Sequence, residues 1–394
     1  MPTRTRQSAN QALSNARSAK QDEFYTQLVD IENELRHYRA QLRGKTVLCN
    51  CDDPYESNFF RYFALNFNAL GLKKLIATSY AKSTIAGGYL PLIDMAGLKP
   101  EGKEPYAIEI SEVLDANGDG AIDLADVEWL LRNDANTSRT LKGDSEYGPG
   151  DFRSAECVEY LKQADVVVTN PPFSLFREYM LKLIESKKRF LIIGNVNSVT
   201  TKEIFPLFRN NVVWFGESIR SGDREFRVPA HYPLEAAGFR VDGSGSKFIR
   251  VKGVRWFTNM DNPKRHEEIP LYKTYSASEY PKFDNFEAIE VSKTAEIPLD
   301  FADIMGVPLT FLDRYNPAQF SIVGITKTWF GLASKVYPIQ TQMSANGTVS
   351  EVSKLNDGAV LKVISPPINK TYYKVGPDAY IQTYPRILIR RNGV

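Results

Sequence analysis

Apolar positions in the first half of the chain follow two periods, one helical and one extended. Leu28, Ile31, Leu35 and Tyr38 recur at helical spacing and predict a helix over residues 21–42. Further helices are predicted over 56–67, 154–163 and 175–186, and strands over 45–51, 73–78, 165–169 and 190–194. Strands that alternate with helices predict an α/β fold with a doubly wound, mainly parallel sheet.

The pattern changes near Val212. Beyond it the strands become short, Gly and Pro are frequent and aromatic residues are dense, which is typical of a β-rich region with long connections. We therefore expect an N-terminal arm over 1–20, an α/β domain over 21–211, and a mixed region over 212–394 that completes the sheet.

A distinctive motif lies directly after the strand predicted over 165–169. Asn170-Pro171-Pro172-Phe173 ends that strand, because two consecutive prolines cannot continue a sheet. Ligands of open α/β sheets bind at the carboxyl ends of the strands. An amide, a carbonyl held in place by proline and an aromatic ring at that edge predict a catalytic site, and a Pro-Pro turn after a core strand is the simpler alternative.

These groups suit a reaction at an exocyclic amine. The lone pair of such an amine is delocalised into its ring, and acceptors aimed at its hydrogens would draw the nitrogen toward tetrahedral geometry. The side-chain oxygen of Asn170 and the carbonyl of Pro171 are the two acceptors, and Phe173 would stack on a base taken out of a duplex. The motif resembles that of amino-methyltransferases, which transfer a methyl group from S-adenosylmethionine.

Three polar segments are candidates for binding the cofactor, and the glycine-rich turn usual at nucleotide sites is missing. The candidate residues are Tyr25, Thr26, Asn50, Asp52, Asp53, Asp151 and Phe152. The first pair precedes the sheet, the next three follow the first strand, and the last pair precedes the helix over 154–163. Each segment also has a simpler interpretation: a helix start, a turn built on Asp-Asp-Pro, and an acid stabilised by a helix N-terminus.

Residues 115–126 have the ligand spacing of a calcium-binding loop. Oxygen ligands fall at loop positions 1, 3, 5, 7, 9 and 12, with Gly120 at position 6 and Ile122 at position 8. The ligands would be Asp115, Asn117, Asp119, the carbonyl of Ala121, Asp123 and Asp126. An acidic loop without metal is the alternative, and the number of coinciding constraints favours one structural Ca²⁺.

Composition narrows the class of protein. The chain has 394 residues, of which 43% are hydrophobic, enough for a large core. Its three cysteines do not make a disulfide framework, no apolar run approaches the ~20 residues of a membrane span, and the N-terminus is basic rather than signal-like. We expect a cytoplasmic protein that does not enter a membrane.

The net charge of +2 hides an asymmetry. Residues 101–160 contain 15 acidic and 5 basic residues, a balance of −10, which leaves +12 for the rest of the chain. The candidate phosphate contacts are Arg4, Arg6, Arg17, Lys20, Lys264, Arg265 and Arg390. Nucleic-acid binding and simple solvation of charged faces both fit this distribution.

Four stretches of the chain resemble segments of the same protein family. They are residues 22–26 (Asp-Glu-Phe-Tyr-Thr), 49–54 (Cys-Asn-Cys-Asp-Asp-Pro), 150–154 (Gly-Asp-Phe-Arg-Ser) and 170–179, which begins Asn-Pro-Pro-Phe. Pieces at 255–259, 264–266, 310–313, 315–317 and 386–390 follow in order. Over nearly its whole length the chain resembles the EcoRI-type family of adenine-specific DNA methyltransferases, and the calcium-like loop departs from that pattern.

The resemblance implies S-adenosylmethionine, N6-methylation of adenine in duplex DNA, base flipping, and target recognition C-terminal to the motif. It makes 21–211 the catalytic domain, with an insertion at about 101–148, and assigns target recognition to 212–394. We expect a bacterial or phage-encoded enzyme of a restriction-modification or phage system, monomeric or weakly dimeric, that works beside a cognate restriction endonuclease. An RNA or protein amide methyltransferase and a DNA-binding protein without activity are the alternatives.

Overall fold

The computed structural model describes residues 26–51, 57–80, 105–120, 122–133, 138–219, 223–228 and 238–393. The chain forms two compact units. The first is Met1–Val196 with Phe215–Asn262, and the second is Asn197–Trp214 with Pro263–Val394. The chain therefore passes from one unit to the other three times. The boundaries expected after residues 20 and 211 divide the chain by functional role, and they stay a prediction.

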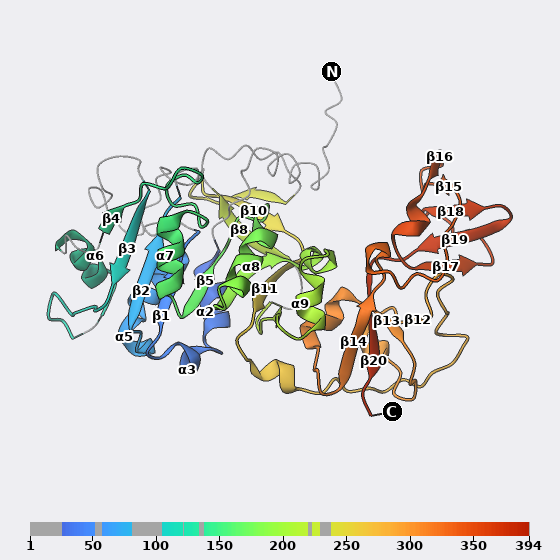
Figure 1. The fold of residues 1–394 in the computed structure, drawn as a ribbon, viewed down its shortest axis with the longest axis horizontal. Coiled ribbons are helices and arrows are strands. Elements are labelled where there is room, and N and C mark those ends of the chain that lie inside the picture. Colours follow the sequence, from blue (N-terminus) through green and yellow to red (C-terminus); the bar gives the residue numbers. More distant parts are fainter. Residues whose placement is uncertain are drawn as a thin grey trace, which may run out of the picture. The chain divides into compact units, whose positions relative to one another are not determined.

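The first unit is built on an eight-stranded sheet with the order β4-β3-β2-β1-β5-β6-β11-β7 (Figure 1). In that order the strands are β4 (Ser138–Thr140), β3 (Tyr106–Ile110), β2 (Lys74–Thr78), β1 (Thr46–Cys49), β5 (Val166–Thr169), β6 (Arg189–Asn195), β11 (Val254–Thr258) and β7 (Trp214–Phe215). The order reverses between β1 and β5, because β2 is added on one side and β6 on the other. Such a switch point is where open α/β sheets bind ligands.

The centre of this sheet is parallel and its flanks are not. β2, β1, β5 and β6 pair in parallel. β3 and β4 on one side and β11 on the other pair antiparallel. The expectation of a mainly parallel sheet is correct for the core and wrong for the flanks. The direction of a strand depends on the length and path of its connection, which its own residues do not encode.

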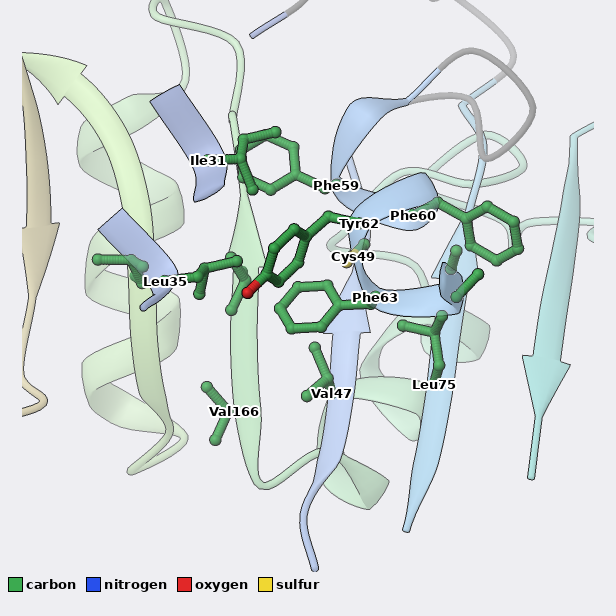
Figure 2. Packing of buried hydrophobic residues seen from close by; sticks show 14 of the residues in the cluster. Ile31, Leu35, Val47, Cys49, Phe59, Phe60, Tyr62, Phe63, Leu75 and Val166 are labelled. Carbon is green, nitrogen blue, oxygen red and sulfur yellow. The ribbon is translucent and has the colours of Figure 1, made fainter. Parts of the chain in front are cut away.

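Helices cover both faces of the parallel core. They are α2 (Leu28–Leu35), α3 (Arg39–Leu42), α4 (Asn58–Leu65), α5 (Phe67–Leu70), α6 (Leu124–Asn133), α7 (Ala155–Gln163) and α8 (Phe176–Glu185). α2 and α4 pack apolar side chains onto β1, β2 and β5 (Figure 2). Ile193 faces that core, so Gly194 faces the opposite side. A Cβ at Gly194 would lie 2.3 Å from the ring of Phe176, which places α8 on that opposite face.

The predicted elements are present with shifted bounds, and two predicted helices are split. Within the described residues, the helix expected over 21–42 consists of α2 and α3. The turn between them is tightened, because the backbone N–H of Tyr38 donates to the carbonyl of Leu35 at 3.0 Å, three residues back. The helix expected over 56–67 is α4, followed after one turn residue by α5.

A three-stranded antiparallel sheet also belongs to the first unit. Its strands, in order, are β8 (Arg224–Val228), β10 (Lys247–Val251) and β9 (Phe239–Val241). Phe226, Val228, Ile249 and Val251 are buried in the same core as α2 and α4. The small sheet is therefore packed onto the core of the large sheet, although it follows the Asn-Pro-Pro-Phe motif by about fifty residues in sequence.

The second unit contains two further sheets. The four-stranded sheet is β12 (Ile289–Glu290), β13 (Met305–Pro308), β20 (Arg386–Arg391) and β14 (Phe320–Ile325), and the five-stranded sheet is β16 (Val349–Val352), β15 (Gln340–Met343), β18 (Tyr372–Val375), β19 (Asp378–Gln382) and β17 (Val360–Val363). The remaining short helices are η1 (Val196–Thr200), α9 (Phe205–Arg209), η2 (Pro263–His266), η3 (Thr294–Glu296), η4 (Leu309–Arg314), η5 (Thr328–Phe330) and η6 (Lys354–Asp357). These sheets confirm the expected β-rich C-terminal region.

Candidate active site

Two asparagines follow adjacent parallel strands at the switch point of the sheet. Asn50 comes directly after β1, and Asn170 comes directly after β5. The two strands pair in parallel, with Leu48 opposite Val167, so their carboxyl ends meet at one edge. Both asparagines are buried, with exposed fractions of 4% and 5%. The loop after β1 and the motif after β5 therefore lie at the same carboxyl edge of the sheet, as the sequence predicts.

The Asn-Pro-Pro-Phe motif turns the chain from β5 into α8. Asn170 and Pro171 are buried, and Pro172 and Phe173 are half-buried. The carbonyl of Pro172 accepts a hydrogen bond from the backbone N–H of Leu175 at 2.9 Å, which closes the turn. Phe173 packs against the core of the first unit, and its ring meets that of Phe226 edge-on at 6.4 Å. The first two residues of the motif are thus fixed, and the last two keep part of their surface open.

A pocket opens beside the motif. It is lined by Asn50, Cys51, Tyr80, Gly150, Asp151, Phe152, Pro172 and Leu175. Three lining residues were predicted to bind the cofactor, namely Asn50, Asp151 and Phe152. Pro172 belongs to the predicted catalytic motif. The structure therefore brings the loop after β1, the segment before α7 and the motif after β5 to one cavity.

Four lining residues were not predicted from the sequence. Tyr80 follows β2, the neighbour of β1, and the rule that ligands bind at carboxyl ends of strands could have identified it. Cys51 and Gly150 adjoin predicted residues. Leu175 has no signal beyond its place before α8. Cys51 is one of three buried cysteines, Cys49, Cys51 and Cys157, none of which is in a disulfide within the described residues.

Gly150 holds one wall of the pocket against the end of β2. Its φ is +75°, a left-handed conformation that favours glycine. A Cβ at this position would lie 1.9 Å from the carbonyl oxygen of Ser79. No L-residue with a side chain fits there without moving the backbone, so the approach of Asp151 and Phe152 to the sheet edge depends on this glycine.

Asp151 is held by a charged network. Its two oxygens accept hydrogen bonds from Nε and Nη2 of Arg153 at 2.9 and 2.8 Å. Arg153 also donates to Glu178 of α8 at 3.1 Å. The bonds to Asp151 raise the pKa of Arg153, so the guanidinium stays charged. Ser154 caps α7, because its Oγ accepts a hydrogen bond from Cys157 N, and Asp151 is therefore not the cap itself.

The other predicted cofactor residues are only partly described. Thr26 is 2% exposed, and its carbonyl accepts a hydrogen bond from Nδ2 of Asn58 at 2.8 Å at the start of α4. Its buried hydroxyl has no hydrogen-bond partner among the described residues. Tyr25, Asp52 and Asp53 lie outside the described residues.

The structure does not support the calcium prediction. The carboxylate of Asp115 accepts hydrogen bonds from three backbone N–H groups of its own loop, at 2.7 to 3.1 Å. That of Asp126 accepts from Ala116 N and Asp123 N at 2.7 and 2.8 Å. These bonds, that from Asp123 foremost, lower the pKa of Asp126.

The carboxylates of this loop thus face its own N–H groups rather than a common centre. Asn117 donates to Asp119 at 2.9 Å, and Ala125 N donates to Asp123 at 2.7 Å. Ala121 lies outside the described residues. Throughout the described ranges, no three His, Cys, Asp or Glu side chains are arranged to hold a metal ion.

The candidate DNA contacts differ in exposure. Lys264 is buried with 5% of its surface exposed, and Arg265 is half-buried, with its guanidinium 3.4 Å from the centroid of the Trp214 ring. Arg390 is exposed near the end of β20. Burial favours a structural role for Lys264, whereas Arg390 is open to a partner. Arg4, Arg6, Arg17 and Lys20 lie outside the described residues.

Comparisons with known proteins show what the chain is similar to. The chain is 44% identical over 324 residues to the type II methyltransferase M.EcoRI of Escherichia coli. The aligned residues are 82% of this chain and 91% of M.EcoRI. The chain is 36% identical over 316 residues to M.MpnI of Mycoplasma pneumoniae, which covers 79% of this chain and 84% of the relative, and equally identical to M.MgeORF184P of Mycoplasma genitalium. No solved structure matches significantly.

No helix in the described parts of the chain is long and apolar enough to cross a membrane. The model of the EcoRI adenine-specific methyltransferase family matches residues 12–392. With that match and the identity to M.EcoRI, the chain belongs to the EcoRI family of adenine-specific DNA methyltransferases.

Proposed function

We propose that the protein methylates N6 of an adenine flipped out of duplex DNA, with S-adenosylmethionine as the methyl donor. The observation that carries this proposal is the shared cavity: Pro172 of the motif lines the same pocket as Asn50, Asp151 and Phe152. A donor bound there would lie next to the acceptors that hold the target amine. Because the relatives are named type II methyltransferases, we place the protein in a restriction-modification system, beside a cognate endonuclease.

The residues of the pocket fit a nucleoside cofactor with an amino-acid tail. Phe152 supplies an apolar wall, and Asn50 and Asp151 supply buried polar groups. The buried hydroxyl of Thr26, which lacks a partner among the described residues, is a further candidate contact. We propose that Tyr25, Asp52 and Asp53 contribute to the same site.

In this proposal Asn170 and Pro171 orient the target amine. The side-chain oxygen of Asn170 and the carbonyl of Pro171 accept its two hydrogens and localise the lone pair on nitrogen. When bound, S-adenosylmethionine would supply the methyl group from its sulfonium to this nitrogen, and the amine would give up one proton to solvent. Burial of Asn170 fixes its orientation, so these acceptors need little reorganisation during the reaction.

Phe173 is the proposed stacking partner of the flipped base. One side of the Phe173 ring packs against Phe226 in the core. The exposed part of the ring is the surface on which a base would stack. Family membership favours DNA over the RNA and protein substrates that the motif alone allowed. The intact motif favours an enzyme over a DNA-binding protein without activity.

The first test is Asn170→Ala. Removing one preorganised acceptor should lower the rate of methyl transfer by about a hundredfold or more, equivalent to about 3 kcal/mol in the barrier. Transfer of labelled methyl groups to duplex DNA measures the rate, and a gel-shift titration should show unchanged affinity for DNA. Asn66→Ala is the control, because Nδ2 of Asn66 donates a hydrogen bond to Tyr62 O of the same helical region at 2.8 Å. Wild-type turnover in Asn170→Ala would refute the proposed role.

A further inference from the structure

Tyr179 lies behind two walls of the pocket without lining it. It belongs to α8 and is 1% exposed. Its hydroxyl donates a hydrogen bond to Oδ1 of Asn50, which is 129 residues away in sequence. Its ring meets the ring of Phe152 edge-on, with centroids 4.9 Å apart. One buried side chain therefore contacts both Asn50 and Phe152, which come from different loops.

The same residue is tied to the catalytic motif through the backbone. The N–H of Tyr179 donates to the carbonyl of Leu175 at 2.9 Å, and the N–H of Leu175 donates to the carbonyl of Pro172 at 2.9 Å. Leu175 and Pro172 both line the pocket. Tyr179 is thus placed by the turn that ends the motif, and it links that turn to Asn50 and Phe152.

The hydrogen bond also determines which end of the Asn50 amide meets the pocket. The Tyr179 hydroxyl donates to Oδ1 of Asn50, and burial raises the pKa of Tyr179 well above its ordinary value, so the proton of this bond is retained. Oδ1 of Asn50 accepts from this hydroxyl and, at 3.8 Å, from Sγ of Cys51. Among the described residues no acceptor takes a hydrogen bond from Nδ2 of Asn50. The amide NH₂ is therefore the end left for a ligand.

We infer that Tyr179 is a positioning residue that fixes the Asn50 amide as a hydrogen-bond donor toward the cofactor. This inference rests on the proposed function and makes it more specific. Asn50 then recognises an acceptor of the cofactor, which is a carboxylate or hydroxyl oxygen or a ring nitrogen, and not its ammonium group. The polarity follows from geometry: with Oδ1 occupied, a donor on the ligand would meet the N–H groups of the amide.

Tyr179→Phe tests the positioning role. The variant keeps the ring against Phe152 and removes only the hydroxyl. We expect the Kd for S-adenosylmethionine, measured by titration calorimetry, to rise about five- to tenfold, the worth of one hydrogen bond. At saturating cofactor, kcat should stay near the wild-type value, because the motif is untouched. Unchanged affinity, or a loss of kcat with unchanged KM, would overturn the inference.

Tyr280→Phe is the matched control in the second unit. The hydroxyl of Tyr280 is also engaged in one hydrogen bond, to the carbonyl of Glu296 at 2.8 Å. The Tyr280→Phe variant should lose about as much folding stability as Tyr179→Phe, and it should keep the wild-type affinity for S-adenosylmethionine. Equal loss of affinity in both tyrosine variants would show a general structural effect and contradict a specific role for Tyr179.

Asn50→Asp tests the polarity of the contact and does not depend on the tyrosine variant folding. Aspartate keeps an oxygen for Tyr179 but offers the ligand an acceptor in place of a donor. Affinity for S-adenosylmethionine should fall at least tenfold, and tighter binding would show that Asn50 faces the ammonium group. Failure of the wild-type protein to bind S-adenosylmethionine at all would instead refute the proposed function.

Discussion

A single glycine decides whether one wall of the pocket forms. At Gly150 the backbone has a φ of +75°, and the space for a Cβ is taken by the carbonyl of Ser79. We expect Gly150→Ala to weaken S-adenosylmethionine binding more than tenfold and to lower the melting temperature, because left-handed backbone alone costs roughly 1–2 kcal/mol for other residues. Calorimetry and thermal unfolding measure the two effects.

Gly148 provides the control for that substitution. It lies two residues before Gly150, and a Cβ there would meet nothing within 4 Å. Gly148→Ala should therefore bind the cofactor as the wild-type protein does. If the two alanine variants behave alike, the tight approach to Ser79 does not shape the pocket.

At the scale of an element, the loop over 115–126 is held by its own carboxylates. Hydrogen bonds keep the pKa of Asp126 below its ordinary value of 3.8, so this carboxylate stabilises the fold above that value and loses its contribution as the pH falls through the lowered pKa. Asp126→Asn should lower the melting temperature at pH 7, and the difference from wild type should shrink in acid. EDTA should leave the wild-type melting curve unchanged.

The matched variant for this loop is Glu112→Gln, since Glu112 is an exposed acid just before it. It should have no effect at either pH. A rise in melting temperature on adding calcium, abolished by Asp126→Asn, would contradict the view that the carboxylates serve the loop's own N–H groups.

At the scale of the whole molecule, the charge is divided between an acidic segment and a basic remainder, −10 against +12. Affinity for duplex DNA should therefore fall steeply with salt. Each phosphate contact contributes about 0.9 to the slope of log affinity against log salt. Removing residues 1–17, which carry Arg4, Arg6 and Arg17, should lower that slope by up to about 2.7. Fluorescence anisotropy over a range of salt concentrations measures it.

Arg390→Ala tests one contact in the same assay. Arg390 is exposed on β20, so its loss should lower the slope by about 0.9 if it meets a phosphate. Lys264→Ala is the contrast, because its burial predicts a change in stability and an unchanged slope. An affinity independent of salt would contradict the proposed electrostatic contacts altogether.

The local sequence was sufficient to predict the strands of the parallel core and the Asn-Pro-Pro-Phe motif. The Val run before Asn170 is buried on both faces of the sheet, and buried parallel strands are recognisable as continuous apolar runs. Pro171 and Pro172 end that strand whatever its tertiary surroundings. β3 and β11 were missed, because an antiparallel partner is selected by a connection and not by the residues of the strand.

By itself the sequence determined which groups are present at the carboxyl edge: an amide, two prolines and a ring after one strand, and polar residues after another. Those properties depend on spacing along a single segment. The tertiary structure decided which segments meet. It placed Tyr179 between Asn50 and Phe152, and it directed the carboxylates of Asp115 and Asp126 to backbone N–H groups where spacing alone suggested a metal. Contacts between distant residues and the partner that a carboxylate selects are set by packing, which no local pattern records.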